Sequence, residues 1–474
     1  MRKCFRIAIL LLFGLPVPSR AQSLEEIIRL AQDSTITAFR SKFEYQYHQE
    51  QNARFEALRK PQLTLQFKPN YYRMIAEPSR DYVYIRNFDR FSTSAQLMLT
   101  QKVLPWGGNA YVGSQVLWSE YFSRDNLNRP RDFVAMPLVA GYQQSLIGYN
   151  PFRWEKAAQD QRLEAARKQY SAQLYQIAEE ATVRFFRLVC AQGILDMCER
   201  NKQTADTLYA IAKEKASIAM ITLAELRSLE LQRLNAANAL LNARNEEKLA
   251  RESLLAYLRV DEASFPLDRR LPIPTITKGI PLTEEDALEM AISRSPEVEQ
   301  GRAAITEASG LQAKARRESG VKVGVDLNVG MQQLSDHFLG AYQNQNLYVL
   351  GVVSLTIPLM DHGASKRERA AAEAWKAREE QALREARRAL SEDVRTTLED
   401  LRSHQQLLVH TEEAVAMADE VFALTAENYA NGLCDINTYS LAQSRRDNAY
   451  NQHLTALANY WTTYYHLLTL TQYE

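Results

Sequence analysis

The sequence predicts a mainly α-helical protein that also contains β-strands of the kind that crosses a membrane. Three observations lead to this prediction: the chain repeats itself, each half contains a very long helical pattern, and each half contains strands that alternate between apolar and polar residues. The chain has 474 residues, and no Gly-, Ser- or Pro-rich linker divides it into serial domains. The repeat therefore has to account for the organisation of the chain.

Composition narrows the possible classes of protein. The chain has 57 Lys and Arg residues against 57 Asp and Glu residues, so it lacks the positive excess of nucleic-acid-binding proteins. Mean hydropathy is −0.37, and no run of 18 apolar residues follows the N-terminus, which excludes membrane-spanning helices. Only Cys190, Cys198 and Cys434 follow the N-terminal segment, and an odd number argues against a disulfide framework.

The first 21 residues have the features of a secretory signal peptide. It begins with the positively charged residues Arg2, Lys3 and Arg6. An apolar core follows at residues 7–15, and Ser19-Arg20-Ala21 form a small-x-small cleavage site. We therefore expect residues 1–21 to be removed and the mature chain to begin at Gln22.

The two halves of the mature chain follow the same plan. Residues 23–31 match residues 283–291 at an offset of 260, whereas residues 205–236 match residues 418–449 at an offset of 213. The first half therefore carries 47 additional residues, the difference between the two offsets. The expected organisation is a first repeat at 22–258, a connector at 259–281 and a second repeat at 282–474.

Each repeat begins with a helix whose start is marked in the sequence. Ser23 is followed three residues later by Glu26, and Thr283 is followed by Asp286. Both pairs form a capping-box pattern before an apolar run. We expect the first of these helices to cover about 24–59.

The longest helical patterns cover about 152–218 and 364–431. At 1.5 Å per residue, each corresponds to roughly 100 Å. Apolar side chains recur every seven residues in the second pattern, as in a coiled-coil seam: Val394, Leu401, Leu408, Val415, Phe422 and Tyr429. A return helix of about half the length follows each long one, at about 223–258 and 437–470.

The β-strands carry the signal for a membrane. Residues 321–331 alternate strictly between apolar residues and polar residues or glycine, over the length of a tilted membrane-spanning strand. Strands are expected over about 321–357 in the second repeat and about 62–147 in the first. The side chains expected to face lipid are Val321, Val323, Val325, Leu327, Val329, Leu63, Leu65 and Phe67.

Aromatic residues are concentrated around the strands of the first repeat. Between positions 62 and 154, 17 residues are aromatic, roughly twice the chain average of 9%. Aromatic girdles at the two surfaces of a membrane produce such enrichment, and so does the core of a soluble β-sandwich. The long helices between the strands favour the membrane, because a symmetric oligomer can pool the strands and leave no unpaired edge in lipid.

Several motifs, taken in order, resemble those of the TolC-like outer-membrane efflux proteins, also called outer membrane factors. They are Ile357-Pro-Leu-Met-Asp-His-Gly363 between a strand and a long charged helix, Tyr429-x-x-Gly432 at a helix end, and Ile436-x-x-Tyr439-x-Leu441-x-Gln443 after it. With the duplicated plan, the resemblance covers residues 22–474.

The resemblance implies a homotrimer whose pooled strands form a transmembrane β-barrel in the outer membrane, continued by an α-helical barrel in the periplasm. It implies the function of an outer-membrane channel subunit, the passive exit duct of a tripartite efflux pump or a type I secretion system. The implied partners are two more copies of the chain, outer-membrane lipid, a periplasmic adaptor (membrane fusion) protein, and an inner-membrane RND or ABC transporter.

The additional residues of the first repeat leave two interpretations open. They contain a third alternating pair at about 105–147, with Val112 on one strand and Ala140 on the other. Members of the family typically contribute four strands each, twelve in a trimer; six here would give eighteen, unless the third hairpin lies outside the barrel. Pro137 weakens the prediction of its second strand.

The resemblance also assigns a role to the two ends where a long helix turns into its return helix: contact with the adaptor and gating of the tunnel. Gly432 fits a helix C-cap in the left-handed conformation. Many family members carry acidic residues just beyond this end, but here only Asp435 is acidic nearby, and a helix N-cap also explains it. The candidate residues are Ala219, Thr222, Gly432, Asp435 and Thr438.

The sequence contains no constellation that predicts catalysis. The His residues form no i, i+4 pair, and phosphate loops, Ser-x-x-Lys and Gly-x-Ser-x-Gly motifs are missing from the sequence. Asp361-His362-Gly363 is explained as a turn between strand and helix. We therefore expect no enzyme activity, no cofactor and no metal. The alternative function is a secreted, soluble coiled-coil scaffold or interaction protein whose strands form a β-sandwich.

Overall fold

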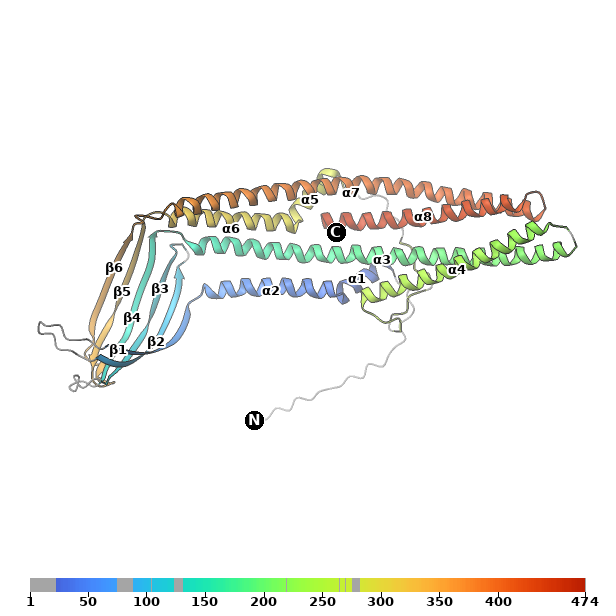
Figure 1. The fold of residues 1–474 in the computed structure, drawn as a ribbon. Coiled ribbons are helices and arrows are strands. Elements are labelled where there is room, and N and C mark those ends of the chain that lie inside the picture. The colour runs from blue at the N-terminus through green and yellow to red at the C-terminus, as the bar shows by residue number, and fades with distance from the viewer. Residues whose placement is uncertain are drawn as a thin grey trace, which may run out of the picture. The chain divides into compact units, whose positions relative to one another are not determined.

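The computed structural model describes residues 23–74, 88–103, 105–122, 131–218, 220–263, 265–268, 270–274 and 282–473 (Figure 1). The predicted signal peptide at 1–21 lies outside these residues. The described chain is mostly helical and contains an antiparallel sheet, as the sequence predicts. Among its helices, none is both long enough and apolar enough to cross a membrane.

The described elements follow the same order in both halves, apart from one additional hairpin in the first and a short 3-10 helix in the second. The first half contains α1 (Leu24–Ser34), α2 (Ile36–Leu58), β1 (Gln62–Met74), β2 (Phe88–Val103), β3 (Gly108–Tyr121), β4 (Arg131–Ile147), α3 (Pro151–Ser217) and α4 (Leu223–Leu258). The second contains α5 (Glu284–Arg294), α6 (Pro296–Glu318), β5 (Lys322–Ser335), the 3-10 helix η2 (Gly340–Tyr342), β6 (Asn346–Thr356), α7 (Ala364–Ala430) and α8 (Ile436–Thr471). The long helices α3 and α7 both have 67 residues, and their return helices both have 36.

The single opening helix expected at 24–59 is wrong, because the structure has two helices there. Thr35 is extended, with ψ near 150°, and its hydroxyl accepts a hydrogen bond from the Ala38 backbone N–H at 3.2 Å, which caps α2. The second half breaks at the matching place. There Ser295 caps α6, and Pro296 after it disfavours a helical conformation at Ser295.

The chain forms two compact units, each built from both halves of the sequence. The first unit contains the described parts of Met1–Lys42, Tyr170–Arg294 and Leu390–Glu474. The second contains the described parts of Phe43–Gln169 and Ser295–Ala389. The units therefore do not coincide with the two sequence repeats.

The second unit holds one six-stranded sheet in the order β1-β2-β3-β4-β5-β6, and every neighbouring pair is antiparallel. The additional hairpin, β3–β4, lies in the middle of this sheet. The register of β4 shifts against β5 between Ala135 and Val139, around Pro137, which has no N–H to donate. Because the described strands form one sheet, with no second sheet stacked on it, the β-sandwich alternative is wrong.

One face of this sheet is apolar across all six strands. Directly paired residues share a face, and one row of such pairs contains only apolar side chains: Leu63, Leu99, Val112, Ala140, Val329 and Val349. We call this side of the sheet the apolar face. Leu63, Leu65 and Phe67 are 61–66% exposed on it.

The other residues predicted to face lipid lie on or beside β5. Leu327 and Val329 are exposed, Val323 and Val325 are partly buried, and Val321 is an exposed residue just before the strand. Alternation along the strand puts Val323, Val325 and Leu327 on the apolar face with Val329.

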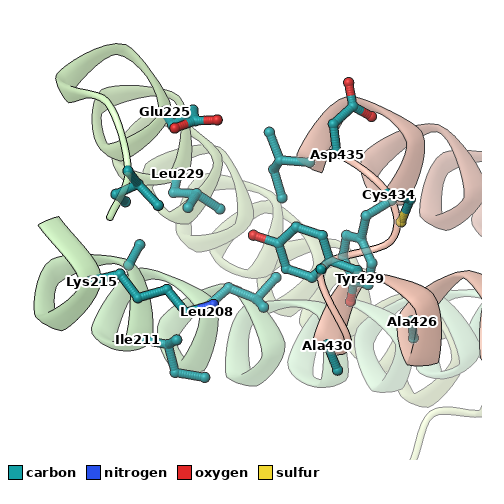
Figure 2. Close-up of a pocket in the computed structure, with 15 residues that line it drawn as sticks. Leu208, Ile211, Lys215, Glu225, Leu229, Ala426, Tyr429, Ala430, Cys434 and Asp435 are labelled. Atoms are coloured by element: carbon teal, nitrogen blue, oxygen red, sulfur yellow. The ribbon is translucent and has the colours of Figure 1, made fainter. Parts of the chain in front are cut away.

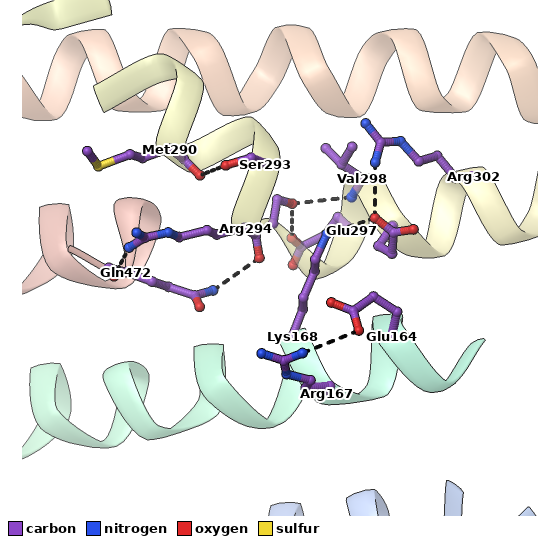
Figure 3. A network of polar contacts seen from close by, with 12 residues as sticks. Glu164, Arg167, Lys168, Met290, Ser293, Arg294, Glu297, Val298, Arg302 and Gln472 are labelled. Atoms are coloured by element: carbon purple, nitrogen blue, oxygen red, sulfur yellow. Dashed lines mark hydrogen bonds and ion pairs between the residues drawn. The ribbon is translucent and has the colours of Figure 1, made fainter. Parts of the chain in front are cut away.

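Helices of the second unit are joined by a buried ion triad. Glu299 on α6 is 8% exposed and accepts hydrogen bonds from Lys168 on α3 at 2.8 Å and from Arg302 at 3.1 Å (Figure 3). Two positive groups therefore compensate the cost of burying this carboxylate.

The first unit has a continuous hydrophobic core. Its largest fully buried side chains include Phe185, Phe186 and Leu254, and the Phe186 ring stacks on Trp461 with 6.3 Å between centroids. Residues of the predicted connector at 259–281 contribute to this core through Leu267 and Leu271. Near the C-terminal end of α8, Gln472 and Arg294 exchange hydrogen bonds between side chain and backbone (Figure 3).

Candidate functional site at the ends of two helical hairpins

The first helical hairpin turns between α3 and α4. Thr222 caps α4: its hydroxyl accepts a hydrogen bond from the Glu225 backbone N–H at 3.2 Å, and its own N–H donates to the Glu225 carboxylate at 2.8 Å. This capping box explains why the chain re-enters a helix at Leu223. Ala219, the other candidate residue of this turn, lies outside the described residues.

The second helical hairpin turns between α7 and α8. Gly432 has φ of +73°, the left-handed conformation that the sequence predicts, and the Leu433 N–H donates to the Asn428 carbonyl at 2.8 Å. Asp435 then caps α8, because its carboxylate accepts hydrogen bonds from the Thr438 backbone N–H at 2.9 Å and hydroxyl at 2.6 Å. These bonds, the hydroxyl foremost, hold the pKa of Asp435 below its usual range. Asp435 and Thr438 thus form one cap.

A cavity of about 560 Å³ lies between the two hairpin ends (Figure 2). Most of its lining is apolar and includes Leu208, Ile211, Leu229 and Ile436, with polar groups from Lys215, Glu225, Tyr429 and Asp435. We call it the hairpin-end cavity. Of the candidate residues predicted from the sequence, Gly432 and Asp435 line the cavity. Thr222 caps α4, and Asp435 caps α8 together with Thr438.

Aromatic rings hold the second hairpin together beside this cavity. The Tyr439 ring packs against Tyr429 and Phe422, with centroid distances of 5.3 and 5.4 Å. Burial raises the pKa of Tyr429, and the negative charge of Glu225 on the other hairpin adds to the shift. The three rings therefore contribute packing at this hairpin end.

A polar cluster joins the two hairpins close to these rings. Asn201 on α3 donates to the Asp447 carboxylate at 2.6 Å and accepts from the Arg446 guanidinium at 2.8 Å. Arg446 also pairs with Asp447 at 2.9 Å. In this region the contact between α3 and α8 therefore includes hydrogen-bonded polar and charged groups.

Sequence reasoning missed Arg446 and Asn201, although a signal for Arg446 was present. Arg446 lies over the Phe422 ring, and Arg233 lies over the Tyr209 ring. Both the arginines and the rings correspond at the repeat offset of 213. A search of the repeat for paired cationic and aromatic residues would therefore have found this contact. Asn201 has no such signal.

In the part of the chain that the structure describes, no group of three His, Cys, Asp or Glu side chains could hold a metal ion. Cys434 in the second turn donates to the Thr425 carbonyl at 3.6 Å. Both return helices thus begin at capped residues, and a partly apolar cavity lies between the two hairpin ends.

Comparisons with known proteins bear on both the fold and the family. Residues 287–471 match the family model described as outer membrane efflux protein. A search of curated proteins finds no significant match.

Three solved structures illustrate the similarity of fold. A membrane protein from Pseudomonas aeruginosa is similar with a TM-score of 0.70 and 14% identity, over 94% of this chain and 90% of that chain. The CmeC outer membrane channel of Campylobacter jejuni is similar with a TM-score of 0.69 and 12% identity, over 94% and 85%. The outer membrane protein VceC of Vibrio cholerae is similar with a TM-score of 0.67 and 13% identity, over 94% and 95%.

Proposed function

We propose that this protein is the exit duct of a tripartite efflux pump or a type I secretion system. The proposal starts from the family: the chain belongs to the outer membrane efflux protein family. Residues 287–471 carry this assignment, and the fold agrees with it. Members of this family are outer-membrane channels with a periplasmic helical part. In our proposal three copies of the chain pool their strands into one barrel, and their helices form the periplasmic tunnel. Transport through it is passive, and an inner-membrane RND or ABC transporter supplies the energy.

One feature of the sheet supports this proposal most strongly: its apolar face is exposed in the single chain. A row of apolar pairs crosses all six strands, and Leu63, Leu65 and Phe67 are largely exposed on it. Exposing this much apolar surface to water is unfavourable, whereas lipid accepts it. We therefore propose Leu63, Leu65, Phe67, Val321, Val323, Val325, Leu327 and Val329 as lipid-facing residues.

Aromatic residues on the apolar face support the proposal that one surface of the membrane lies at their level along the strands. Tyr71 pairs with Phe91, Trp118 pairs with Phe133, and the Phe91 and Trp118 rings are 5.9 Å apart. The pairing puts these four side chains on the apolar face, several residues along the strands from Leu63 and Val112. Such a group is typical of an aromatic girdle at a membrane interface.

The edges of the sheet support assembly from several copies. Among the described strands, β1 pairs only with β2, and β6 pairs only with β5. Backbone groups on an open edge have no water to bind inside a bilayer, so both edges require a strand of another chain. A cyclic trimer satisfies both edges with the same contact.

The two hairpin ends are the proposed contact with the adaptor and the proposed gate. Thr222, Asp435 and Thr438 cap the return helices, Gly432 shapes the second turn, and Ala219 belongs to the first turn by sequence. Opening requires the ends to separate, which breaks contacts such as that of Asn201 with Asp447.

Fractionation and reconstitution test the proposal. We expect the mature protein in the outer-membrane fraction, as a trimer in detergent that conducts ions after insertion into a planar bilayer. A protein found in the soluble periplasm and monodisperse without detergent would contradict it. Chemical cross-linking in cells followed by purification of the protein should recover an adaptor and an inner-membrane transporter; recovery of neither would remove the tripartite assignment.

A further inference from the structure

The additional hairpin, β3–β4, is bonded into the sheet along both of its long sides. The β2–β3 register runs without a break from Arg90 with Tyr121 to Val103 with Gly108. On the other side, β4 pairs with β5 from Phe133 to Ile147, with two shifts of register. This hairpin therefore separates β2 from β5 by two complete strands.

The two faces of the sheet continue through the hairpin. On the apolar face, Val112 and Ala140 fill the row between Leu99 and Val329. On the opposite face, which we call the polar face, a row of three glutamines runs from β1 to β3: Gln66, Gln96 and Gln115. The hairpin thus has the same apolar and polar sides as the strands on either side of it.

A side-chain contact on the polar face also ties the hairpin to β5. Tyr111 on β3 reaches across Gly141 on β4 and donates a hydrogen bond to Asn328 on β5. A Cβ atom added at Gly141 would lie 2.3 Å from the Tyr111 ring, so only glycine leaves room for this crossing. The hairpin is therefore an integral part of the sheet on both faces.

The geometry points to a barrel wall that includes this hairpin. We propose, on the basis of the function proposed above, that β6 of one copy pairs with β1 of the next and that three copies close an eighteen-stranded barrel. In a meander with an even number of strands, the two edges run in opposite directions, so this pairing continues the antiparallel order. Six strands are too few to enclose a lumen alone, because even eight leave room only for side chains.

The consequence is a wider exit than twelve strands would give. Barrel diameter grows about linearly with strand number, so eighteen strands give about 1.5 times the diameter of twelve, and barrels of this size leave an aqueous channel. The outer opening therefore accepts bulky solutes, such as polymers, that a twelve-stranded barrel excludes.

Cysteine labelling locates the hairpin directly. In a variant whose other cysteines are replaced by serine, single cysteines are placed by Val112→Cys and Gln115→Cys on β3, with Leu65→Cys and Gln66→Cys on β1 as matched controls. A charged, membrane-impermeant maleimide should label positions 66 and 115, which share the polar face, and should leave positions 65 and 112 unlabelled. Labelling of both β3 positions, with position 65 protected, places the hairpin outside the membrane and overturns the inference.

The same controls separate this inference from the proposed function. If positions 65 and 66 are both labelled, the sheet does not cross a membrane, and the proposed function itself fails. If position 65 is protected and position 112 is labelled, only the inclusion of the hairpin fails.

A deletion tests the width. Removing Gly108–Ile147 leaves residues 104–107 and 148–150 as the link from β2 to α3, equal in length to the 357–363 link from β6 to α7. We expect this variant to form a twelve-stranded barrel that excludes polyethylene glycols which enter the full-length channel from the outer side, as measured by their effect on conductance. Equal size limits overturn the inference, and a variant that does not assemble leaves the decision to the labelling.

Discussion

Arg446 on α8 lies over the face of the Phe422 ring on α7, with 4.1 Å between its Cζ atom and the ring centroid. Arg233 on α4 lies over Tyr209 on α3 in the same way, at 4.6 Å. The two contacts correspond at the repeat offset of 213. Each return helix is therefore fastened to its long helix, near the hairpin end, by the same kind of cation–π contact.

Replacing Arg446 by methionine should loosen the second hairpin end. The change removes the cation–π contact, worth about 1 kcal/mol, and the hydrogen bond to Asn201. Amide hydrogen exchange should accelerate around Phe422 and Tyr439. Arg402→Met, at an exposed position of α7, is the control and should leave exchange there unchanged. Unchanged exchange in Arg446→Met would show that the contact does not hold the hairpin.

His466 makes the stability of the first unit depend on pH. Its Nδ1 lies 3.0 Å from the Glu179 carboxylate on α3, and its Nε2 lies 3.7 Å from Asp393 on α7. The hydrogen bond to Glu179 raises the pKa of His466 against the opposing effect of burial, and both carboxylates add to the rise. Because the pKa of His466 is higher in the folded protein, its contacts contribute fully to stability below the pKa that His466 has in the unfolded chain. This contribution is lost as pH rises through the pKa that it has in the folded protein.

The melting temperature of His466→Gln should therefore fall less than that of the natural protein between about pH 5 and pH 8. Because His466 is partly exposed, we expect the pH-dependent part to be at most about 1 kcal/mol. His410→Gln is the control, because the His410 side chain is 76% exposed. If His466→Gln and the natural protein show the same pH dependence, the His466 contacts do not contribute.

Lys168→Met should destabilise the second unit by about 2 kcal/mol, because it removes one of the two cations that compensate the buried Glu299 carboxylate. Burial acts to raise the pKa of Glu299, but Lys168 and Arg302 outweigh it and hold the pKa below its usual range. The pairing of Glu299 with these cations thus stabilises the fold above the pKa that Glu299 has in the unfolded chain. This stabilisation is lost as pH falls through the lower pKa that Glu299 has in the folded protein.

Thermal melting at neutral pH checks this prediction. The double variant Lys168→Met with Glu299→Met is the matched control, because it removes both members of the pair and leaves no buried carboxylate. It should recover part of the stability lost in Lys168→Met. A double variant that is less stable than the single one would contradict the explanation by an unpaired charge.

Gly432→Ala should strain the second turn. At φ of +73° an alanine costs about 1 kcal/mol more than glycine, although the added Cβ would meet no atom within 4 Å. Gly320→Ala is the matched control, since its Cβ would also meet nothing but its φ is not in the left-handed range. Hydrogen exchange at Leu433 should increase only in the first variant; equal effects of both would point to a cause other than backbone strain.

Asp435 allows its structural and electrical roles to be separated. Asp435→Ala should cost about 1 kcal/mol through loss of the cap on α8, whereas Asp435→Asn keeps an acceptor for Thr438 and should cost less. Asp435→Lys should in addition change the conductance or the cation block of the reconstituted channel, if the carboxylate faces the tunnel. A conductance identical to that of the natural protein would remove Asp435 from the pore.

Local patterns in the sequence determined most of the secondary structure. The seven-residue spacing from Val394 to Tyr429 predicts α7, and the alternation at 321–331 predicts β5, because both depend only on which neighbouring side chains share a face. The break at Ser295 was readable from Pro296. The break at Thr35 was not, because a threonine inside an amphipathic pattern is compatible with a helix.

Only the tertiary structure decided where the additional hairpin lies and which residues meet between the hairpin ends. Strand pairing such as that of Ala140 with Val329 joins residues far apart in the chain, and alternation specifies the two faces of a strand without naming its neighbour. Likewise, Gly432 by itself predicts a turn. The contact of Asn201 with Arg446 and Asp447, in contrast, depends on how four helices pack. By itself the sequence determined the elements and their faces, because these are local; the tertiary structure decided the neighbours, because these depend on long-range packing.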